Sequence, residues 1–446
     1  MADARVEIIR RLTRREAWPA LQRTLEKTRA EDIAAAVNLL APTHQRRLVD
    51  CLRDDEKVAE ILCMLNAHER PALMTSIPFE RLVTLMQLMP VDDEADVIAS
   101  LPEALRKKVL NALEGDEKAQ VEDILAWPVD SAGGIMHPAA FRLQQDLTCR
   151  DAISALQEAG DLEMVFYLYV ENEQNQLVGV ASLRGLLTHP PSTSLKAMMS
   201  AEVISVPPET DQEEVARIVD RYDLLALPVV DHDRRLLGIV TIDDIVDVIK
   251  EEAVEDMMLM AGLGENLDPA KHSVFHSFKE RFQWLLLTLV GGIGMAELIN
   301  IFDGDLAKQT VLAGFIPVML GTGGNVGTQA ATIAVRNIAT GHAGSLGTPK
   351  MLFREARVGA LLGLGFAIVL GGYALARWAE QPMLGLSIAI SLILIVINAA
   401  TLGMLVPLTL NRIGVDPAVA TGPFVTTSID LVAILIYFGT CGLLLN

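Results

Sequence analysis

Asp430 is the residue whose type and position most directly suggest chemistry, because it stands inside a long apolar segment, residues 418–445. An ionisable side chain within a membrane-length segment is costly and is by default a candidate for ion passage. It follows the start of that segment by about 12 residues, or ~18 Å along a helix, near the middle of a bilayer. Thr426 and Thr427, one turn earlier, add hydroxyl oxygens. The alternative is a neutral carboxylic acid hydrogen-bonded to a neighbouring helix.

The expected metal follows from the ligand atoms around Asp430. No cluster of histidine and cysteine side chains that would suit a soft metal accompanies it. Carboxylate, hydroxyl and carbonyl oxygens suit a hard cation, and magnesium is usually held through retained waters by one or two carboxylates. One carboxylate cannot neutralise a divalent ion, whereas two can if a two-fold axis joins two copies. The sequence therefore predicts a homodimer in which Asp430 of each subunit faces a shared pore.

A second unusual stretch, residues 316–329, reads IPVMLGTGGNVGTQ and carries four glycines between Gly321 and Gly327, just after Pro317. Irregular backbone at membrane depth is tolerated only where it is buried in protein or lines a watery cavity. Freed carbonyls there could orient a hydrated cation. Close packing of helices through small residues is the alternative. The presence of Asp430 favours the first interpretation.

Acidic residues also follow a helical period before the apolar segments. Asp244, Asp247, Glu251 and Glu255 fall along one face of a helix expected from residue 242 onward. Like charges at this spacing repel one another, so we expect a divalent cation opposite them. A second group, Asp92, Asp93, Glu94 and Asp96, is either a further metal site or a solvated helix start favoured by the helix dipole.

Composition separates the chain into two regions. Asp and Glu outnumber Lys and Arg by 49 to 28 before Ser277, and from there on the counts are 8 and 9. Such asymmetry indicates two solvents, and an acidic soluble region is a poor binder of nucleic acid. The first 18 residues lack the apolar core of a signal peptide, so we expect this region to stay in the cytoplasm. Four cysteines without a CxxC pair and the lack of a nucleophile or phosphate-loop motif give an enzyme no support.

The expected architecture is a multidomain membrane protein. Residues 30–127 read as short helices with a loose repeat of about 25 residues, typical of stacked helical hairpins. From Gly133 a unit of strand, helix, two strands and helix occurs twice, which predicts a tandem α/β pair resembling CBS modules. The predicted domains are an all-α N-terminal region at 1–130, CBS copies at 131–190 and 191–250, a connecting helix at 251–280 and an α-helical membrane domain at 281–446.

Nucleotide binding is a further expectation for the second CBS copy. In modules that bind adenine nucleotides, a hydroxyl residue followed three positions later by Asp commonly holds the ribose. Thr241 and Asp244 match this pattern, whereas the first copy has Ser182 followed by Gly185. The sequence therefore allows ATP at one site at most.

Five segments are long and apolar enough to cross a bilayer. They are Phe282–Phe302, Thr310–Ile338, Arg357–Trp378, Leu384–Leu410 and Ala418–Leu445. Lys and Arg gather in the loops after the second and fourth segments, which places those loops and the N-terminus in the cytoplasm. Five spans then leave the C-terminus outside.

The whole chain resembles the MgtE family of bacterial magnesium channels. The resemblance rests on the acidic helical region, the tandem CBS pair, the acidic connecting helix, GTGGNVGTQ, and GVDPAVATGPFVTTSIDLVAILIYF near the end. It implies a homodimer in the plasma (inner) membrane with the pore on the dimer axis. It also implies that intracellular Mg²⁺ bridges the acidic domains and closes the pore.

The resemblance also implies roles for particular residues. Asp430 would hold hydrated Mg²⁺ in the pore. Pore-lining positions would be Gly324, Asn325, Thr328, Gln329, Thr332, Gly422, Thr426 and Thr427. Regulatory Mg²⁺ would bind Asp223, Asp244, Asp247, Glu252, Glu255, Asp256 and Asp416, and also Asp92, Asp93 and Asp96. Some members have Asn where this chain has Gly422, so an amide near the pore would be missing here.

Two other functions remain open from the sequence. A secondary divalent-cation exchanger could use a similar membrane domain, although proton coupling calls for more ionisable residues at depth than Asp430 and Glu297. A membrane-anchored CBS sensor that transports nothing would need neither Asp430 nor the glycine run.

Overall fold

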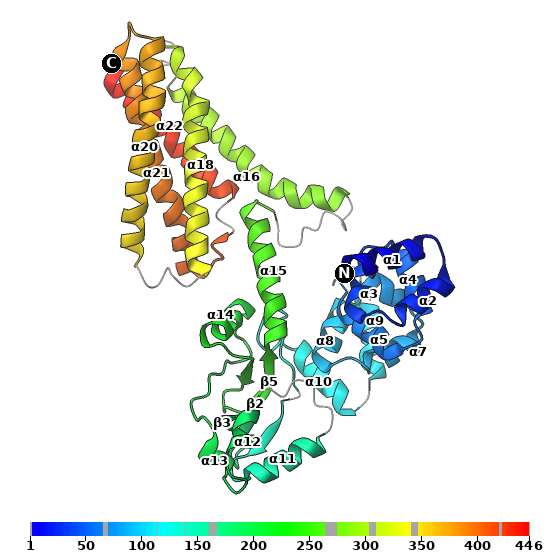
Figure 1. Cartoon of the computed structure of the whole chain (residues 1–446). Coiled ribbons are helices and arrows are strands. Elements are labelled where there is room, and N and C mark those ends of the chain that lie inside the picture. The colour runs from blue at the N-terminus through cyan, green and yellow to red at the C-terminus, as the bar shows by residue number, and fades with distance from the viewer. Residues whose placement is uncertain are drawn as a thin grey trace. The chain divides into compact units, whose positions relative to one another are not determined.

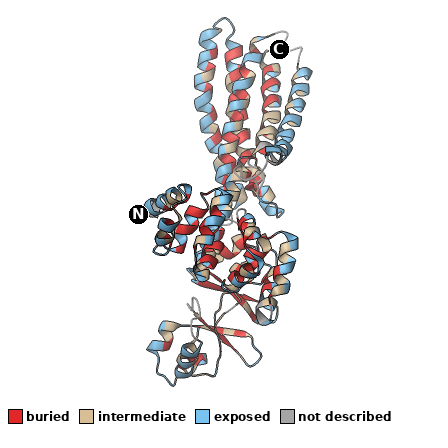
Figure 2. Cartoon of the chain, turned by 90° about the vertical axis from the view of Figure 1, so that its right-hand side faces the viewer, coloured by how far each residue is buried: buried red, intermediate tan, exposed pale blue. Residues whose placement is uncertain are grey.

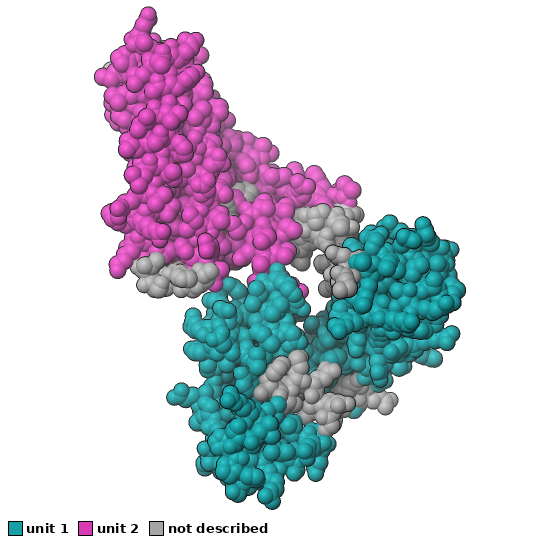
Figure 3. Space-filling model, in the orientation of Figure 1, with its two compact units in different colours: residues 1–250 teal, residues 251–446 magenta. Residues whose placement is uncertain are grey.

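The computed structural model describes residues 2–65, 70–113, 115–138, 140–159, 167–263, 274–302, 309–339, 347–418 and 422–445. Contacts divide the chain into two compact units, residues 1–250 and 251–446 (Figure 3). Each unit is described separately below.

The first unit begins with short helices (Figure 1). They bury one continuous apolar core, which includes Ile33, Leu62 and Leu85. The helices are α1 (Ala2–Arg14), α2 (Trp18–Leu25), α3 (Ala30–Val37), α4 (Pro42–Cys51), α5 (Asp55–Cys63), α6 (Arg70–Ser76), α7 (Phe79–Met86), α8 (Val91–Ser100), α9 (Glu103–Ala112) and α10 (Gly115–Leu125). The prediction of an all-α N-terminal region is confirmed.

Two arginines make the same hydrogen bonds at two places among these helices. Arg70 donates from Nη2 to the carbonyls of Cys63 and Leu65, seven and five residues earlier, at 2.8 and 2.9 Å. Arg106 caps the end of α8 with the same offsets, through the carbonyls of Ala99 and Leu101. The last carbonyls of a helix have no partner within it, so these cations satisfy them and hold neighbouring helices together.

Two related α/β units follow. In the first, β1 (Arg142–Gln144) pairs in parallel with β2 (Tyr167–Glu171), which pairs in antiparallel with β3 (Leu177–Ser182). In the second, β4 (Ala226–Val230) and β5 (Leu236–Thr241) pair in antiparallel, and a parallel bridge between Val206 and Val229 occupies the place of β1. The helices are α11 (Cys149–Glu158), α12 (Leu183–Thr188), α13 (Leu195–Met198), α14 (Gln212–Tyr222) and α15 (Ile242–Met260). The expected duplication is confirmed.

The second unit consists mainly of five long helices, α16 (Val274–Ile301), α18 (Val311–Ala339), α20 (Thr348–Arg377), α21 (Pro382–Arg412) and α22 (Pro423–Leu445). All five are long and apolar enough to cross a membrane, as predicted. α21 packs against α18, α20 and α22. Exposed residues cover the outer sides of the long helices, whereas buried residues face inward (Figure 2).

The expectation of irregular backbone in the glycine-rich stretch is wrong, because residues 311–339 form one continuous helix with Pro317 inside it. The glycines of one face allow close packing. A Cβ on Gly323 would lie 3.0 Å from Cγ2 of Ile395 on α21, and one on Gly327 would collide with Cδ1 of Ile429 on α22. The alternative of helix packing through small residues therefore describes this face.

Candidate functional site

Asp430 lies on α22 opposite a glycine of α18. Its Oδ1 is 3.8 Å from the position that a Cβ on Gly324 would occupy, so the missing side chain leaves the carboxylate room. This oxygen is buried and accepts no hydrogen bond from any residue in the described ranges. Two turns later, the hydroxyl of Tyr437 donates to the carbonyl of Leu312 at 2.9 Å and fixes α22 against α18. Asp430 thus lies on a helix that is hydrogen-bonded to α18, and its Oδ1 has no partner in the described part of the chain.

The side of α18 away from its packing face is polar. Asn325, Gln329 and Thr332 are exposed in the single chain although they lie in the middle of a membrane-length helix. Thr328 and Thr332 donate their hydroxyls to the carbonyls of Gly324 and Thr328, both at 2.9 Å. Each hydroxyl oxygen therefore keeps its capacity to accept hydrogen bonds, for example from water around an ion.

The two threonines before Asp430 have different surroundings. Thr426 donates to the carbonyl of Gly422 at 3.4 Å, a long bond within the first turn of α22. Thr427 directs its methyl group at Gly291 of α16, where a Cβ would collide with it. The structure therefore places Thr427 at the contact between α16 and α22.

The end of α15 packs against the membrane helices of its own unit. Leu259 forms a small apolar cluster with Val335 of α18 and Ala418 in the loop before α22. Gly422 faces the same helix end, because a Cβ there would lie 3.2 Å from the backbone N and Cα of Gly262. An Asn at position 422 would meet this backbone, which explains why glycine fits.

Asp416 shapes the loop that receives α15. Its Oδ1 accepts a hydrogen bond from the backbone N–H of Ala418 at 2.7 Å, as in an Asx turn. The side chain is otherwise exposed. The loop therefore presents a carboxylate close to the chain segment that contacts Leu259.

Asp244 is a carboxylic acid of the first unit whose pKa is strongly raised. Burial raises its pKa to about 7, the hydrogen bond from Thr241 opposes the rise, and the negative charges of Asp92 and Asp243 add to it. The hydroxyl of Thr241 donates to Asp244 Oδ2 at 2.5 Å. The two residues predicted to hold a ribose thus bond to each other.

The remaining acids of α15 differ in exposure. Asp247 is exposed and forms an ion pair with Lys250 at 2.6 Å, a partner that the sequence offered three residues away. Glu252, Glu255 and Asp256 are partly buried on the following turns. The predicted row of acidic residues without a cationic partner therefore does not include Asp247, whose charge Lys250 compensates.

The acids at the start of α8 point to different neighbours. Asp92 Oδ1 lies 3.6 Å from Nε2 of His137, in the segment before the first α/β unit, and its charge also acts on Asp244. Asp93 lies beside Cys63, where burial and then the Asp93 charge raise the thiol pKa. Asp96 lies one turn further along α8. His137 was missed by sequence reasoning, because a lone histidine carries no spacing signal.

Asp223 has a backbone reason for its position. It ends α14 in the left-handed conformation, with φ 50° and ψ 46°, and its N–H donates to the carbonyl of Val219. Asp tolerates this conformation better than most residues. The side chain is exposed, so it can accept a cation from solvent.

A metal site complete within one chain is not visible among the described residues, since no three or more His, Cys, Asp or Glu side chains converge there. Carboxylates occur singly or in pairs, as at Asp92 and Asp244. This donor set suits Mg²⁺ that keeps most of its water.

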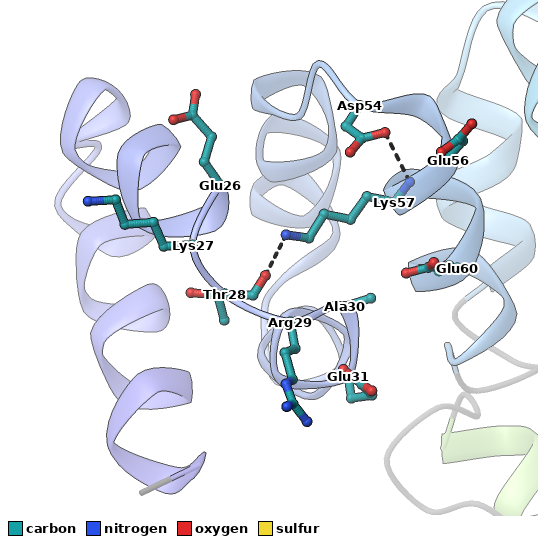
Figure 4. Close-up of a pocket in the computed structure, with 10 residues that line it drawn as sticks. All are labelled: Glu26, Lys27, Thr28, Arg29, Ala30, Glu31, Asp54, Glu56, Lys57 and Glu60. Atoms are coloured by element: carbon teal, nitrogen blue, oxygen red, sulfur yellow. Dashed lines mark hydrogen bonds between the residues drawn. The ribbon is translucent and has the colours of Figure 1, made fainter.

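A surface hollow of about 500 Å³ lies among the N-terminal helices (Figure 4). It contains none of the predicted site residues. Lys57 stands within it and donates to the carbonyls of Leu25 and Thr28. The lining residues carry both charges: Glu26, Lys27, Thr28, Arg29, Ala30, Glu31, Asp54, Glu56, Lys57 and Glu60.

Comparison with known proteins matches three regions to family profiles. Residues 316–440 match MgtE, described as a divalent cation transporter, residues 28–130 match the MgtE intracellular N domain, and residues 195–251 match a CBS domain. The magnesium transporter MgtE of Thermus thermophilus is 34% identical over 96% of this chain and 95% of its own length. The Bacillus subtilis protein of the same name is 32% identical over 93% of this chain and 92% of its own.

A solved structure described as the cytosolic domain of the Mg²⁺ channel MgtE in complex with ATP is 34% identical to the matched part. The match covers 52% of this chain and 94% of that chain, with a TM-score of 0.49.

Proposed function

The chain belongs to the MgtE family of divalent cation transporters, and we propose that it is a magnesium-selective channel. In this proposal Mg²⁺ enters the cell through a homodimer in the bacterial plasma membrane, and cytosolic Mg²⁺ closes the pore. Mg²⁺ is the substrate and the regulator, and the protein catalyses no reaction. The names of the full-length relatives, both magnesium transporters, support the choice of ion.

The observation that carries the proposal is the buried Oδ1 of Asp430, which lies opposite Gly324 and has no hydrogen-bond donor among the residues that the structure describes. A buried charged oxygen without a partner is strongly destabilising unless a cation or an ordered water supplies one. A hydrated Mg²⁺ provides both charge and donors at this place. The hydroxyl oxygens of Thr328 and Thr332 can accept hydrogen bonds from the outer waters.

The exposed polar face of α18 supports a dimer. Asn325 and Gln329 would each leave an amide in lipid if the chain functioned alone, which costs several kcal/mol per group (about 2–7). A second copy across a two-fold axis would enclose this face with water and bring a second Asp430 to the same pore. Two carboxylates then balance one divalent ion.

The regulatory part of the proposal rests on the acidic residues of the soluble unit and α15. We propose that Mg²⁺ binds Asp92, Asp93, Asp96, Asp223, Asp244, Asp247, Glu252, Glu255, Asp256 and Asp416. Without Mg²⁺, like charges about 6 Å apart cost roughly 2.8 kcal/mol per pair at an effective dielectric near 20, before salt screening. Binding would remove this repulsion and favour the state in which the end of α15 lies against Ala418 and Gly422.

We propose the domain limits 1–130, 131–190, 191–250, 251–280 and 281–446, with the N-terminal domains in the cytoplasm and the C-terminus outside. The distribution of basic residues supports this orientation. Arg336, Lys350, Arg354 and Arg412 lie at one end of the described bundle, and Arg377 lies at the other.

A nucleotide is a second ligand that we propose for the soluble unit. The pair Thr241 and Asp244 at the start of α15 supports it, since both could turn from each other to ribose hydroxyls. ATP and Mg²⁺ would then share Asp244.

The experiment is Mg²⁺ flux into liposomes that contain the purified full chain, followed with an internal magnesium indicator at several membrane voltages. A channel gives flux that rises with inward driving voltage and needs no opposing gradient. Flux that depends on a proton or sodium gradient would identify an exchanger, and no flux would identify a sensor.

A further inference from the structure

The start of α16, residues 274–282, exposes a group of large apolar side chains. Val274, Phe275, Phe278 and Phe282 are 90, 76, 55 and 47% exposed. The first turns of α16 extend away from the other long helices (Figure 1). Exposed phenylalanines of this kind need a covering surface.

These phenylalanines form one stripe. Positions 275, 278 and 282 recur at helical spacing, and the ring centroids of Phe278 and Phe282 are 5.2 Å apart, with Phe275 6.3 Å from Phe278. At 100° per residue, Lys279 and Arg281 flank the stripe on opposite sides, by about 70° and 90°. Both cations are exposed. The segment therefore has an aromatic centre and two basic edges.

We propose that this segment is an interfacial anchor that lies on the cytoplasmic leaflet and binds anionic phospholipid headgroups. The phenylalanine rings enter the boundary between headgroups and acyl chains, and Lys279 and Arg281 reach the phosphates, as in other basic amphipathic helices. The inference rests on the membrane placement proposed above for α16, and it goes beyond ion passage.

The length and continuity of α16 indicate that the surface covering the phenylalanine stripe is the lipid bilayer. The helix has 28 residues, whereas about 20 suffice to cross the hydrocarbon. After Arg281 the next charged residue of the helix is Glu297, so its long charge-free stretch begins at Phe282. The excess turns thus lie where the same helix leaves the bilayer, at the level of the headgroups. Further exposed basic residues, Lys350, Arg354 and Arg412, occupy the same end of the bundle and fit an anionic leaflet.

The test places an environment-sensitive fluorophore (NBD) on Phe278→Cys in the full chain. The matched control carries it on Leu187→Cys, an exposed apolar position of the first unit, 77% exposed. The unsubstituted chain is labelled in parallel, because Cys51 and Cys63 are only partly buried. Both proteins are reconstituted in phosphatidylcholine vesicles, with and without one quarter phosphatidylglycerol, and nitroxide-labelled lipid serves as quencher.

We expect lipid nitroxide to quench the label at position 278 and not at 187, with a larger embedded fraction in phosphatidylglycerol. Lys279→Gln with Arg281→Gln should remove this gain and lower the ratio of embedded to exposed label by roughly 25-fold, since each basic residue contributes about fivefold at an anionic surface. The control pair Arg14→Gln with Arg15→Gln, exposed in the first unit, should change nothing.

Three results would overturn the proposal: a label at 278 that stays in water, a blue-shifted label that lipid nitroxide cannot reach, or an equal effect of both charge-removing pairs. The second result would mean that a second protein copy covers the stripe. Mg²⁺ flux measured in the same vesicles separates this outcome from a failure of the proposed channel function.

Discussion

Asp244 and Asp430 illustrate how the two units use a carboxylate differently. Asp244 lies in the soluble unit, accepts a hydrogen bond from Thr241 and is close enough to Asp92 for their charges to interact. Asp430 lies on a membrane-length helix, and its Oδ1 lies opposite Gly324 and has no donor in the described part of the chain. The first arrangement suits an acid whose charge state and neighbours can change. The second suits an acid whose missing partner is supplied by a cation in the pore.

The largest expected effect removes the charge in the membrane unit. Asp430→Asn keeps the shape of the side chain but should lower Mg²⁺ flux roughly a hundredfold or more, because little else at that depth offsets the desolvation of a divalent ion. Flux into liposomes measures it. Glu297→Gln, which removes a carboxylate of α16, should retain most of the flux. Normal flux through a well-folded Asn variant would contradict the proposal that Asp430 lines the pore.

The next effect concerns the soluble unit alone. Deletion of residues 1–130 removes Asp92 from the neighbourhood of Asp244 and should raise the internal Mg²⁺ needed for half-inhibition by about tenfold or more, while flux persists. Inhibition curves of the truncated and full chains give the comparison. An unchanged curve would show that the N-terminal helices take no part in sensing.

A pH change should separate the two carboxylates further. The pKa of Asp244 is raised to about 7 from 3.8, so protonation stabilises the folded form, and this contribution is lost as the pH rises through 7. Mg²⁺ competes with that proton. Half-inhibition should therefore need up to about tenfold more Mg²⁺ at pH 6 than at pH 8. Asp244→Asn should flatten this dependence, and an equally steep dependence in that variant would assign it to another group.

The smallest effect tests the contact between α15 and the loop before α22. Gly422→Asn would bring a side chain against the backbone of Gly262 and should weaken closure, raising residual flux at high internal Mg²⁺ by roughly threefold. Gly414→Asn is a suitable control, because a Cβ there meets nothing within 4 Å and Asn tolerates its φ of 75°. Equal effects of the two substitutions would contradict the proposal that the contact between α15 and the loop before α22 contributes to closure.

Much of the fold could be predicted from the sequence because periodicity and length are local properties. The five spans and the duplicated α/β unit were correctly predicted, although the third long helix begins at Thr348 instead of Arg357. The prediction of irregular backbone at Gly321–Gly327 was wrong, because a run of glycines is compatible both with a broken helix and with a closely packed one. Only the positions of Ile395 and Ile429 decide between them.

The site was less predictable because its geometry depends on residues far apart in sequence. Nothing local in the chain relates His137 to Asp92, or Gly324 to Asp430. The ion pair between Lys250 and Asp247 could have been predicted from the sequence, because residues three apart are neighbours on a helix. Only the repulsion between the acidic residues around this pair was predicted. Burial of Asp244, which determines its pKa, also needs the folded chain.

The most direct test of the division between passage and sensing measures both in the same proteoliposomes. Protease cleavage between residues 244 and 263, with and without millimolar Mg²⁺, reports sensing, and the magnesium indicator reports passage. We expect Asp430→Asn to lose flux but keep Mg²⁺ protection, and Asp247→Ala combined with Glu255→Ala to keep flux but lose protection. If either protein lost both properties together, the separation of the two carboxylate roles would be contradicted.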